Sequence, residues 1–465
     1  MFPIKLIFIF SILLFFNLTI FIKSNQIIFP FKTEEIKSDS LDYIEEIQDN
    51  KIYITTQIGN PPQKIKLYLT MNTCFLLIAN SSIDSSYYNN ENSKTYVNIT
   101  KSTPYFEIFT NAYLSKENFF FQTSYDNTKI KEFNNIEFMH VLEYSTSEYI
   151  SPGYFGLQLP KKNKMNIFDN LKKSNVISSY IFNINYTSDN EGFLSIGEFP
   201  SQYNDNVEEK DAIKRTNALP CINDYMSNND LCWQLKFNDV KFGDIKVNRD
   251  REAEIMPELG FIKGTKEYQT KIEENYFNKY HNNTCKLNNY GSFFYYYECD
   301  KNIDISSFKD LIFSHQEFMY DFVLTKNDLF KEYKDKLYFL IVFDYYLNYG
   351  NNWKLGKPFI KKYSLVYDAD KKLIYYYDNQ NANKKEKEKE KEKEKEKEKE
   401  KENGGNSKTF IYWIIIGFLG IAMIVMIALV LTKVIFKPKK KQANELKEDN
   451  DYINQEDKEN SLGVS

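Results

Sequence analysis

Few side chains in this sequence are spaced so that they could form a catalytic or metal-binding group. The three histidines, His140, His281 and His315, stand far apart along the chain. No His-rich metal site is therefore expected, and no Ser-His-Asp arrangement can be identified from spacing. We expect no metal ion and no cofactor. Lys and Arg number 60 against 64 Asp and Glu, a formal net charge of −4, which gives no reason to expect nucleic acid as a partner.

The cysteines are the other side chains that could react, and five of them suit an oxidising compartment. Cys285 and Cys299 flank a short aromatic segment and could close a hairpin, while Cys221 and Cys232 bracket a polar loop. Cys74 remains inside an apolar run, where a buried thiol behaves as a small hydrophobe. Glycosylation sequons, permitted in that compartment, begin at four asparagines: Asn80, Asn98, Asn185 and Asn282.

The N-terminus has the pattern of a secretory signal. A basic residue, Lys5, precedes a mostly apolar run that reaches Ile22, which is typical of a signal peptide. We predict a signal peptide over residues 1–24, with an uncleaved anchor as the alternative. A short N-terminal extension then covers residues 25–50.

A second apolar run, Phe410–Leu431, contains no charge. About 22 residues at 1.5 Å each span roughly 33 Å, enough to cross a bilayer core of about 30 Å. The lysine cluster at 437–441 follows, and the positive-inside rule places that end in the cytoplasm. The sequence therefore predicts a single-pass protein, with a transmembrane helix at 410–432, a cytoplasmic tail at 433–465 and its N-terminal domain lumenal or extracellular. The membrane would be that of the cell surface, a lysosome or vacuole, or a secretory vesicle.

A low-complexity region, residues 384–408, precedes this helix, and its part Lys385–Glu402 is a strict Lys-Glu alternation. A period of two would place like charges at i,i+4 on a helix, which disfavours helix, and nothing apolar is available for burial. We interpret the region as a solvated spacer. A charged interaction tract is the alternative.

The part between the two apolar runs has mainly strand patterns. Ile52–Ile58 and Ile65–Leu69 alternate apolar and polar residues with period two. Short helices are predicted at Ile167–Ser174 and Lys266–Lys279. Many short strands with few helices indicate an all-β domain.

Several motifs in this part occur in one order and spacing. Ile52–Gln63 contains Ile-Gly-Asn-Pro-Pro-Gln after a strand, Pro152–Leu157 reads Pro-Gly-Tyr-Phe-Gly-Leu, and Gly192–Gly197 reads Gly-Phe-Leu-Ser-Ile-Gly. A second group of motifs starts with Trp-Gln-Leu at Trp233. It ends with Trp353–Tyr363, which begins Trp-Lys-Leu-Gly-Lys-Pro-Phe-Ile. This order resembles the pepsin-like aspartic peptidases, which carry Ile-Gly-Thr-Pro-Pro-Gln, Asp-Gly-Ile-Leu-Gly-Leu and Trp-Ile-Leu-Gly-Asp-Pro-Phe-Leu at the matching places.

The resemblance covers about residues 50–378 and implies an all-β, bilobal pepsin-like fold, followed by the C-terminal transmembrane helix. The first lobe would span 51–200 and the second 201–383. The resemblance also implies that Gly156 and Gly356 lie in loops threaded beside the aspartate loops, where a side chain would clash. The bridge between Cys285 and Cys299 would match a second-lobe disulfide of the family.

Both catalytic aspartates of the family are missing. Where the family has Asp-Thr-Gly-Ser-Ser, this chain has Thr70-Met-Asn-Thr-Cys, so Thr70 stands at the first aspartate. A gapless comparison over Ala253–Ile262 places Met256 at the second. The family mechanism needs two carboxylates that share one proton, so that one activates water while the other polarises the peptide carbonyl. A hydroxyl and a thioether cannot do this.

Shifts of register offer no replacement pair. A shift of two places would put Asn72 at the first position, and an amide does not ionise. Glu258 lies two residues past Met256, and a slip could bring in that carboxylate, but without a partner. The flap tyrosine of the family would correspond to Tyr105, with Phe109 as a shorter-flap alternative.

These patterns predict a non-catalytic homologue of the peptidases, whose lumenal domain binds a peptide or a protein partner in the interlobe cleft. An active, divergent aspartic endopeptidase is one alternative, and a structural protein of the surface or of vesicles is another. Because no dyad is present to titrate, peptide binding is expected to depend only weakly on pH between about 4 and 7.

Overall fold

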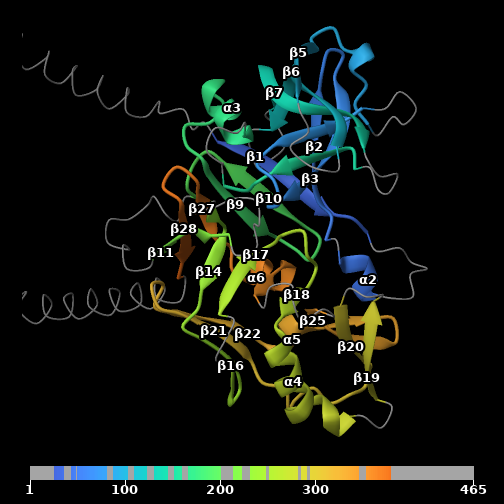
Figure 1. The fold of residues 1–465 in the computed structure, drawn as a ribbon, viewed down its shortest axis with the longest axis vertical. Coiled ribbons are helices and arrows are strands. Elements are labelled where there is room, and N and C mark those ends of the chain that lie inside the picture. Colours follow the sequence, from blue (N-terminus) through green and yellow to red (C-terminus); the bar gives the residue numbers. More distant parts are fainter. Residues whose placement is uncertain are drawn as a thin grey trace, which may run out of the picture. The chain divides into compact units, whose positions relative to one another are not determined.

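The computed structural model covers the central part of the chain in segments (Figure 1). The described residues are 26–35, 43–48, 50–80, 87–102, 109–122, 130–144, 151–159, 166–200, 213–221, 231–247, 251–280, 284–290, 294–344 and 352–378. The chain divides into one unit at Met1–Asn383 and another at Lys384–Ser465. All of the second unit lies outside the described residues.

Several predictions fall outside these segments: the signal peptide, the spacer, the transmembrane helix at 410–432, the tail, Tyr105 and the sequon at Asn282. Within the segments themselves, none of the helices has the length and apolar character needed to cross a bilayer.

The largest sheet of the described structure has thirteen strands in the spatial order β11-β28-β27-β9-β10-β1-β2-β3-β8-β4-β7-β6-β5. Its strands are β1 (Ile27–Thr33), β2 (Ile52–Ile58), β3 (Gln63–Thr70), β4 (Leu76–Ala79), β5 (Val97–Ser102), β6 (Phe109–Gln122), β7 (Ile130–Tyr144), β8 (Gly153–Gly156), β9 (Ile181–Tyr186), β10 (Glu191–Ile196), β11 (Ile213–Asn217), β27 (Val366–Asp368) and β28 (Leu373–Tyr377).

The second half of the chain forms most of the other sheets. The larger of these contains β14 (Gln234–Lys236), β17 (Glu252–Ile255), β26 (Trp353–Leu355), β18 (Ile262–Gly264), β25 (Ile341–Asp344), β20 (Phe294–Asp300), β24 (Lys336–Phe339), β23 (Phe330–Tyr333) and β19 (Cys285–Tyr290). Two smaller sheets contain β16 (Ile245–Val247), β15 (Asp239–Phe242), β21 (Leu311–His315) and β22 (Tyr320–Leu324), and β12 (Leu219–Pro220) with β13 (Leu231–Cys232).

The helices of the described segments are short. They are α2 (Tyr43–Ile47), α3 (Ile167–Lys173), α4 (Lys266–Asn275), α5 (Lys326–Leu329), α6 (Lys357–Lys362) and the 3₁₀ turns η1 (Asn90–Asn92) and η4 (Phe277–Tyr280). The mainly-β prediction is confirmed. The helix predicted at Lys266–Lys279 ends earlier, as α4, and continues as η4.

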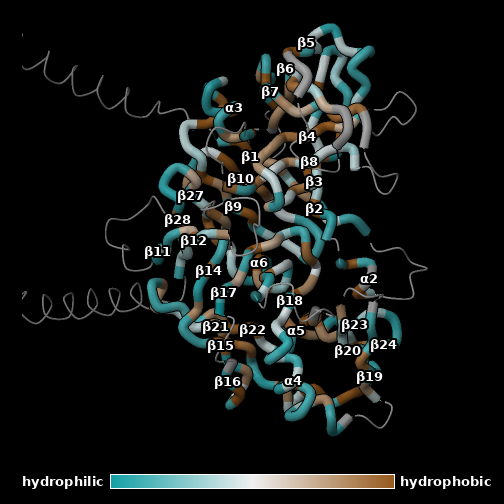
Figure 2. Tube along the Cα trace, in the orientation of Figure 1, coloured by the Kyte–Doolittle hydropathy of each residue, from teal (hydrophilic) through white to brown (hydrophobic). Residues whose placement is uncertain are grey.

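Alternating burial explains why the strands form where the pattern predicts them. In β2, Ile52, Ile54 and Ile58 are buried, while Thr55 and Gln57 point to solvent. Figure 2 shows the hydrophobic stretches along the strands and hydrophilic turns between them. One large buried cluster contains side chains from both halves of the chain.

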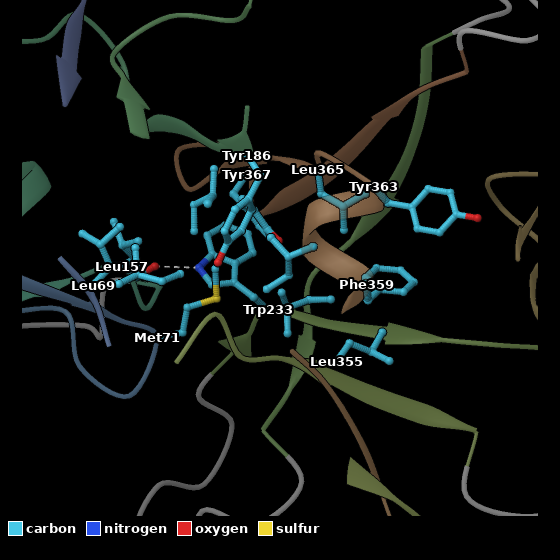
Figure 3. Packing of buried hydrophobic residues seen from close by; sticks show 14 of the residues in the cluster. Leu69, Met71, Leu157, Tyr186, Trp233, Leu355, Phe359, Tyr363, Leu365 and Tyr367 are labelled. Carbon is cyan, nitrogen blue, oxygen red and sulfur yellow. Dashed lines mark hydrogen bonds between the residues drawn. The ribbon is translucent and has the colours of Figure 1, made fainter. Parts of the chain in front are cut away.

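The two halves of the chain share the largest sheet. β27 comes from the end of the described chain and pairs antiparallel with β9, with Tyr367 opposite Phe182. The rings of these two residues stack with centroids 4.7 Å apart. Trp233 Nε1–H donates to the Leu157 carbonyl oxygen at 2.8 Å, the dashed line in Figure 3. These contacts give the loops of the two halves a common support.

Both predicted disulfides are confirmed. Cys285 bonds to Cys299 across the β19–β20 hairpin, where the two residues are direct register partners. Cys221 bonds to Cys232. Cys74 is a buried thiol that belongs to neither bridge.

Candidate functional site

Two parallel strand pairs, one from each half, hold the candidate site residues. β3 runs parallel to β8, with Thr70 opposite Gly156. β17 runs parallel to β26, and the register ends with Ile255 opposite Leu355. The next residues of the second pair are Met256 and Gly356. Thr70 is the last residue of β3, and Met256 is the first residue after β17. Each therefore lies at the end of the first strand of a parallel pair.

The two glycines touch the loops that follow Thr70 and Met256. A Cβ added to Gly156 would lie 2.4 Å from the Thr73 carbonyl oxygen, and one added to Gly356 would lie 2.2 Å from that of Phe261. Both obstacles are backbone atoms, which cannot swing aside as a flexible side chain can. Glycine is therefore required at both places.

Thr70 contacts a carboxyl group of the other half. Its hydroxyl donates to Glu258 Oε1 at 3.3 Å and accepts a hydrogen bond from the Asn72 backbone N–H at 3.0 Å. The turn after Met256 brings the Glu258 carboxyl to Thr70, so its partner there is a hydroxyl and not the second carboxyl that the family mechanism needs. The Leu259 N–H, which donates to the Met256 carbonyl oxygen at 3.1 Å, closes that turn.

The Glu258 carboxyl is in a poor environment for a negative charge. The residue is partly exposed as a whole, but its Oε2 atom is buried and has no hydrogen-bond partner among the described residues. Burial raises the pKa of Glu258 to about 7, and bonds from the Met71 N–H and the Thr70 hydroxyl offset only part of that rise. A single carboxyl of this region therefore has a pKa close to neutral pH, although the side chain that it contacts, Thr70, is not a second carboxyl.

The loop that carries Glu258 is held by the N-terminal extension. The Asn50 side-chain amide donates to the Pro257 carbonyl oxygen at 3.0 Å and to the Tyr186 hydroxyl at 3.1 Å. The Asn50 N–H donates to the Glu258 carbonyl oxygen at 2.6 Å. Asn50 is buried, and nothing in an Asn-rich sequence distinguishes it from its many exposed counterparts.

Met256 itself is buried and contributes no ionisable group. Its N–H donates to the Leu355 carbonyl oxygen at 3.1 Å, and its side chain is 7% exposed. Met71 is also buried, in the cluster drawn with Trp233 in Figure 3. Phe109, the alternative flap residue, begins β6 opposite Tyr144.

The remaining candidate residues are distributed over the fold. Among the described sequons, Asn98 and Asn185 are exposed and Asn80 is half-buried. His140 and His315 are buried, and burial lowers the pKa of each to about 4. No group of three or more potential metal-ligating side chains occurs in the segments that the structure describes.

Comparison with known proteins identifies the family. The family model described as eukaryotic aspartyl protease matches residues 51–376. The chain belongs to the eukaryotic aspartyl protease family. No curated protein gave a significant match.

Solved structures support the same fold. One similar structure is conglutin gamma, described as a unique basic 7S globulin from lupine seeds. It has a TM-score of 0.56 and 11% identity, and the match covers 77% of this chain and 96% of that chain. The likeness concerns the fold alone.

Proposed function

We propose that this protein is a non-catalytic member of its family, which binds an extended peptide or a protein partner between the two halves of the fold. The observation that carries the proposal is the side chain that meets the Glu258 carboxyl. It is the hydroxyl of Thr70, at the end of β3, and not a second carboxyl. Thr70 and Met256 would stand where the family has its two catalytic aspartates.

One carboxyl cannot perform the chemistry of two. Below pH 7 Glu258 is mostly protonated, because burial raises its pKa to about 7, so it cannot take a proton from water. Above pH 7 it is a base, but no second acid is present at Met256 to polarise a peptide carbonyl. General acid–base catalysis typically contributes about 10²–10⁴-fold to a rate, and that contribution would be lost.

Fold membership does not oppose this proposal. Conglutin gamma, which shares the fold, is described as a globulin, and one fold can host unrelated functions. The sequence features of residues 1–24 and 410–432 support a single-pass protein of the secretory pathway, with the peptidase-like part on the lumenal or extracellular side.

The experiment is an incubation of the purified full-length protein with an acid-denatured protein substrate between pH 3 and 8. We expect no turnover. Glu258→Gln is the decisive variant, and Glu252→Gln on the adjacent strand β17 is its matched control. If turnover occurs and Glu258→Gln alone abolishes it, the protein is an active divergent peptidase and the proposal fails. Turnover that both variants retain would come from a contaminating protease.

A further inference from the structure

A cavity of about 570 Å³ is lined by none of Thr70, Met256 and Glu258. It borders the loop that carries Glu258, because Asn50 and Gly260 are among its lining residues. Its walls come from the N-terminal extension, the turn between β9 and β10, strand β23 and helix α6. Part of the lining is apolar: Tyr43, Ile47, Phe330, Tyr333 and Leu340. The volume falls within the usual range for organic ligands, about 300–1,000 Å³.

One wall of the cavity carries more lysines than carboxylates. Lys331, Lys357, Lys361 and Lys362 line it, together with Asp189 and Asp328. Asp189 binds Lys331 at 3.2 Å and also binds Lys361. These two lysines hold the pKa of Asp189 down at about 2, with the Lys361 contact as the main cause. Asp189 therefore already has two lysine partners.

The second carboxylate of that wall is also engaged. Asp328 accepts from Lys362 at 2.6 Å and from the Thr325 N–H at 2.7 Å. Glu34 also lines the cavity and contacts Lys51 at 3.8 Å and Lys66 at 3.7 Å. Glu35 and Glu46 line the cavity as well. Asp189, Asp328 and Glu34 thus each form ion pairs with lysines other than Lys357.

Lys357 is the cation of this wall that has no carboxylate partner among the described residues. Its Nζ has a long contact of 3.4 Å to the Asn190 side-chain oxygen and lies 5.9 Å from the centre of the Tyr186 ring. Burial lowers the pKa of Lys357 to about 8, against the opposing field of Asp189. At pH 7 the ammonium is still mostly protonated, and it is only weakly solvated.

We infer that this cavity binds an organic carboxylate with an apolar body, with Lys357 as the group that recognises the carboxylate. A buried ammonium gains most from an anionic acceptor, since a charge-assisted hydrogen bond replaces the water that it has lost. The apolar lining would receive the body of the ligand. The ligand source would be either the C-terminal residue of a peptide or a small apolar acid. This inference does not depend on the proposed function.

The test is calorimetry of the full-length protein at pH 7 with N-acetyl-Ala-Ala-Phe and with the C-terminal amide of the same peptide. We expect the acid to bind about 10- to 100-fold more tightly than the amide, the usual contribution of a hydrogen bond to a charged group. A third probe, 3-phenylpropionate, identifies the source. If it binds as well as the peptide acid, the ligand is a small acid, and if it binds more weakly, the ligand is a peptide terminus.

Variants assign the effect to Lys357. Lys357→Met should remove the preference for the acid, and Lys357→Arg should keep most of it. Lys336→Met on β24 should change nothing, because Lys336 does not line the cavity. Equal binding of acid and amide by the unmodified protein would overturn the inference without any variant. An acid preference that survives in a folded Lys357→Met protein would overturn it as well.

Discussion

The hydroxyl of Thr70 and the carboxyl of Glu258 lie 3.3 Å apart, although 188 residues separate them in the sequence. Thr70 ends β3 in the first half of the chain, and Glu258 follows β17 in the second. The contact therefore joins the two halves. On the proposed correspondence of Thr70 and Met256 with the two aspartates of the family, a neutral donor and a single titratable acceptor would stand in place of a proton-sharing pair.

The first prediction concerns the stability of the protein against pH. The pKa of Glu258 is raised from its ordinary 4.5 to about 7 in the folded protein, so folding opposes its ionisation. The contribution of this group to the stability of the folded state should be greatest below about pH 4.5, fall as pH rises towards 7, and fall no further above 7. A shift of this size corresponds to about 3 kcal/mol.

Thermal unfolding of the full-length protein at pH 4.5, 6 and 7.5 measures this effect. Glu258→Gln should flatten the dependence, because an amide carries no charge at any of these pH values. Glu252→Gln on β17 is the matched control and should retain it, because Glu252 is not among the groups that shift the pKa of Glu258. A Glu258→Gln protein whose melting temperature falls with pH as steeply as that of the unmodified protein would contradict the prediction.

The second prediction isolates the hydrogen bond of Thr70. Thr70→Val keeps the shape and removes the donor, which leaves Glu258 Oε1 without that bond. We expect a loss of about 1–3 kcal/mol at pH 7.5 and less at pH 4.5, where the carboxyl is neutral. Thr55→Val on the exposed side of β2 is the control. In a double-mutant cycle with Glu258→Gln, purely additive effects would show that the two groups do not interact.

The third prediction concerns the two glycines. Gly156→Ala and Gly356→Ala would each place a methyl group 2.4 Å or less from a carbonyl oxygen of the backbone. We expect a loss of about 3 kcal/mol or more in each case, since the backbone must move. Gly243→Ala should cost less, about 1–2 kcal/mol for the left-handed backbone at φ +58°, because the nearest atoms are the Cγ and Cβ of the exposed Lys309 and not backbone atoms. Urea denaturation measures all three, and similar losses at the three positions would contradict the argument.

The sequence predicts what depends on local patterns. The period-two alternation of Ile52–Ile58 matches β2 residue for residue, and the apolar spacing after Asn166 predicts α3. The hairpin between Cys285 and Cys299 was visible as two cysteines around an aromatic segment. Each of these features depends on residues that are close together in the sequence.

The contacts of the site depend on long-range packing and were not visible. The gapless comparison places Met256 at the second aspartate position but does not show that the following turn carries Glu258 to Thr70. Asn50 is likewise distinguished only by its partner Pro257, 207 residues away. The position of a residue in a motif predicts its backbone, whereas the partner of its side chain depends on the packing of the other half.

The fourth prediction concerns membrane topology. Because the lysines at 437–441 follow the apolar run at 410–431, the short tail should face the cytoplasm. Protease treatment of sealed microsomal vesicles should remove only the tail and leave the aspartyl protease-like part intact. Detergent lysis of the same vesicles is the control, since it exposes both sides. Digestion of the large part in sealed vesicles would show the opposite orientation.

The last prediction concerns peptide binding between the two halves. An extended peptide is held mainly by backbone hydrogen bonds and side-chain pockets, which do not require an ionised aspartate. We expect the full-length protein to bind extended, apolar-rich peptides without cleaving them. The affinity should be constant from pH 4 to about 6, because Glu258 remains protonated there, and should change near its pKa of about 7. Glu258→Gln should extend the constant range to pH 8.

Calorimetry against an apolar peptide pool measures both the affinity and its pH dependence. Thr70→Trp should block binding because a large ring would fill the space beside β3. If nothing binds at millimolar peptide, or if Thr70→Trp leaves binding unchanged, the groove is closed and a structural role at the surface or in vesicles is the better explanation.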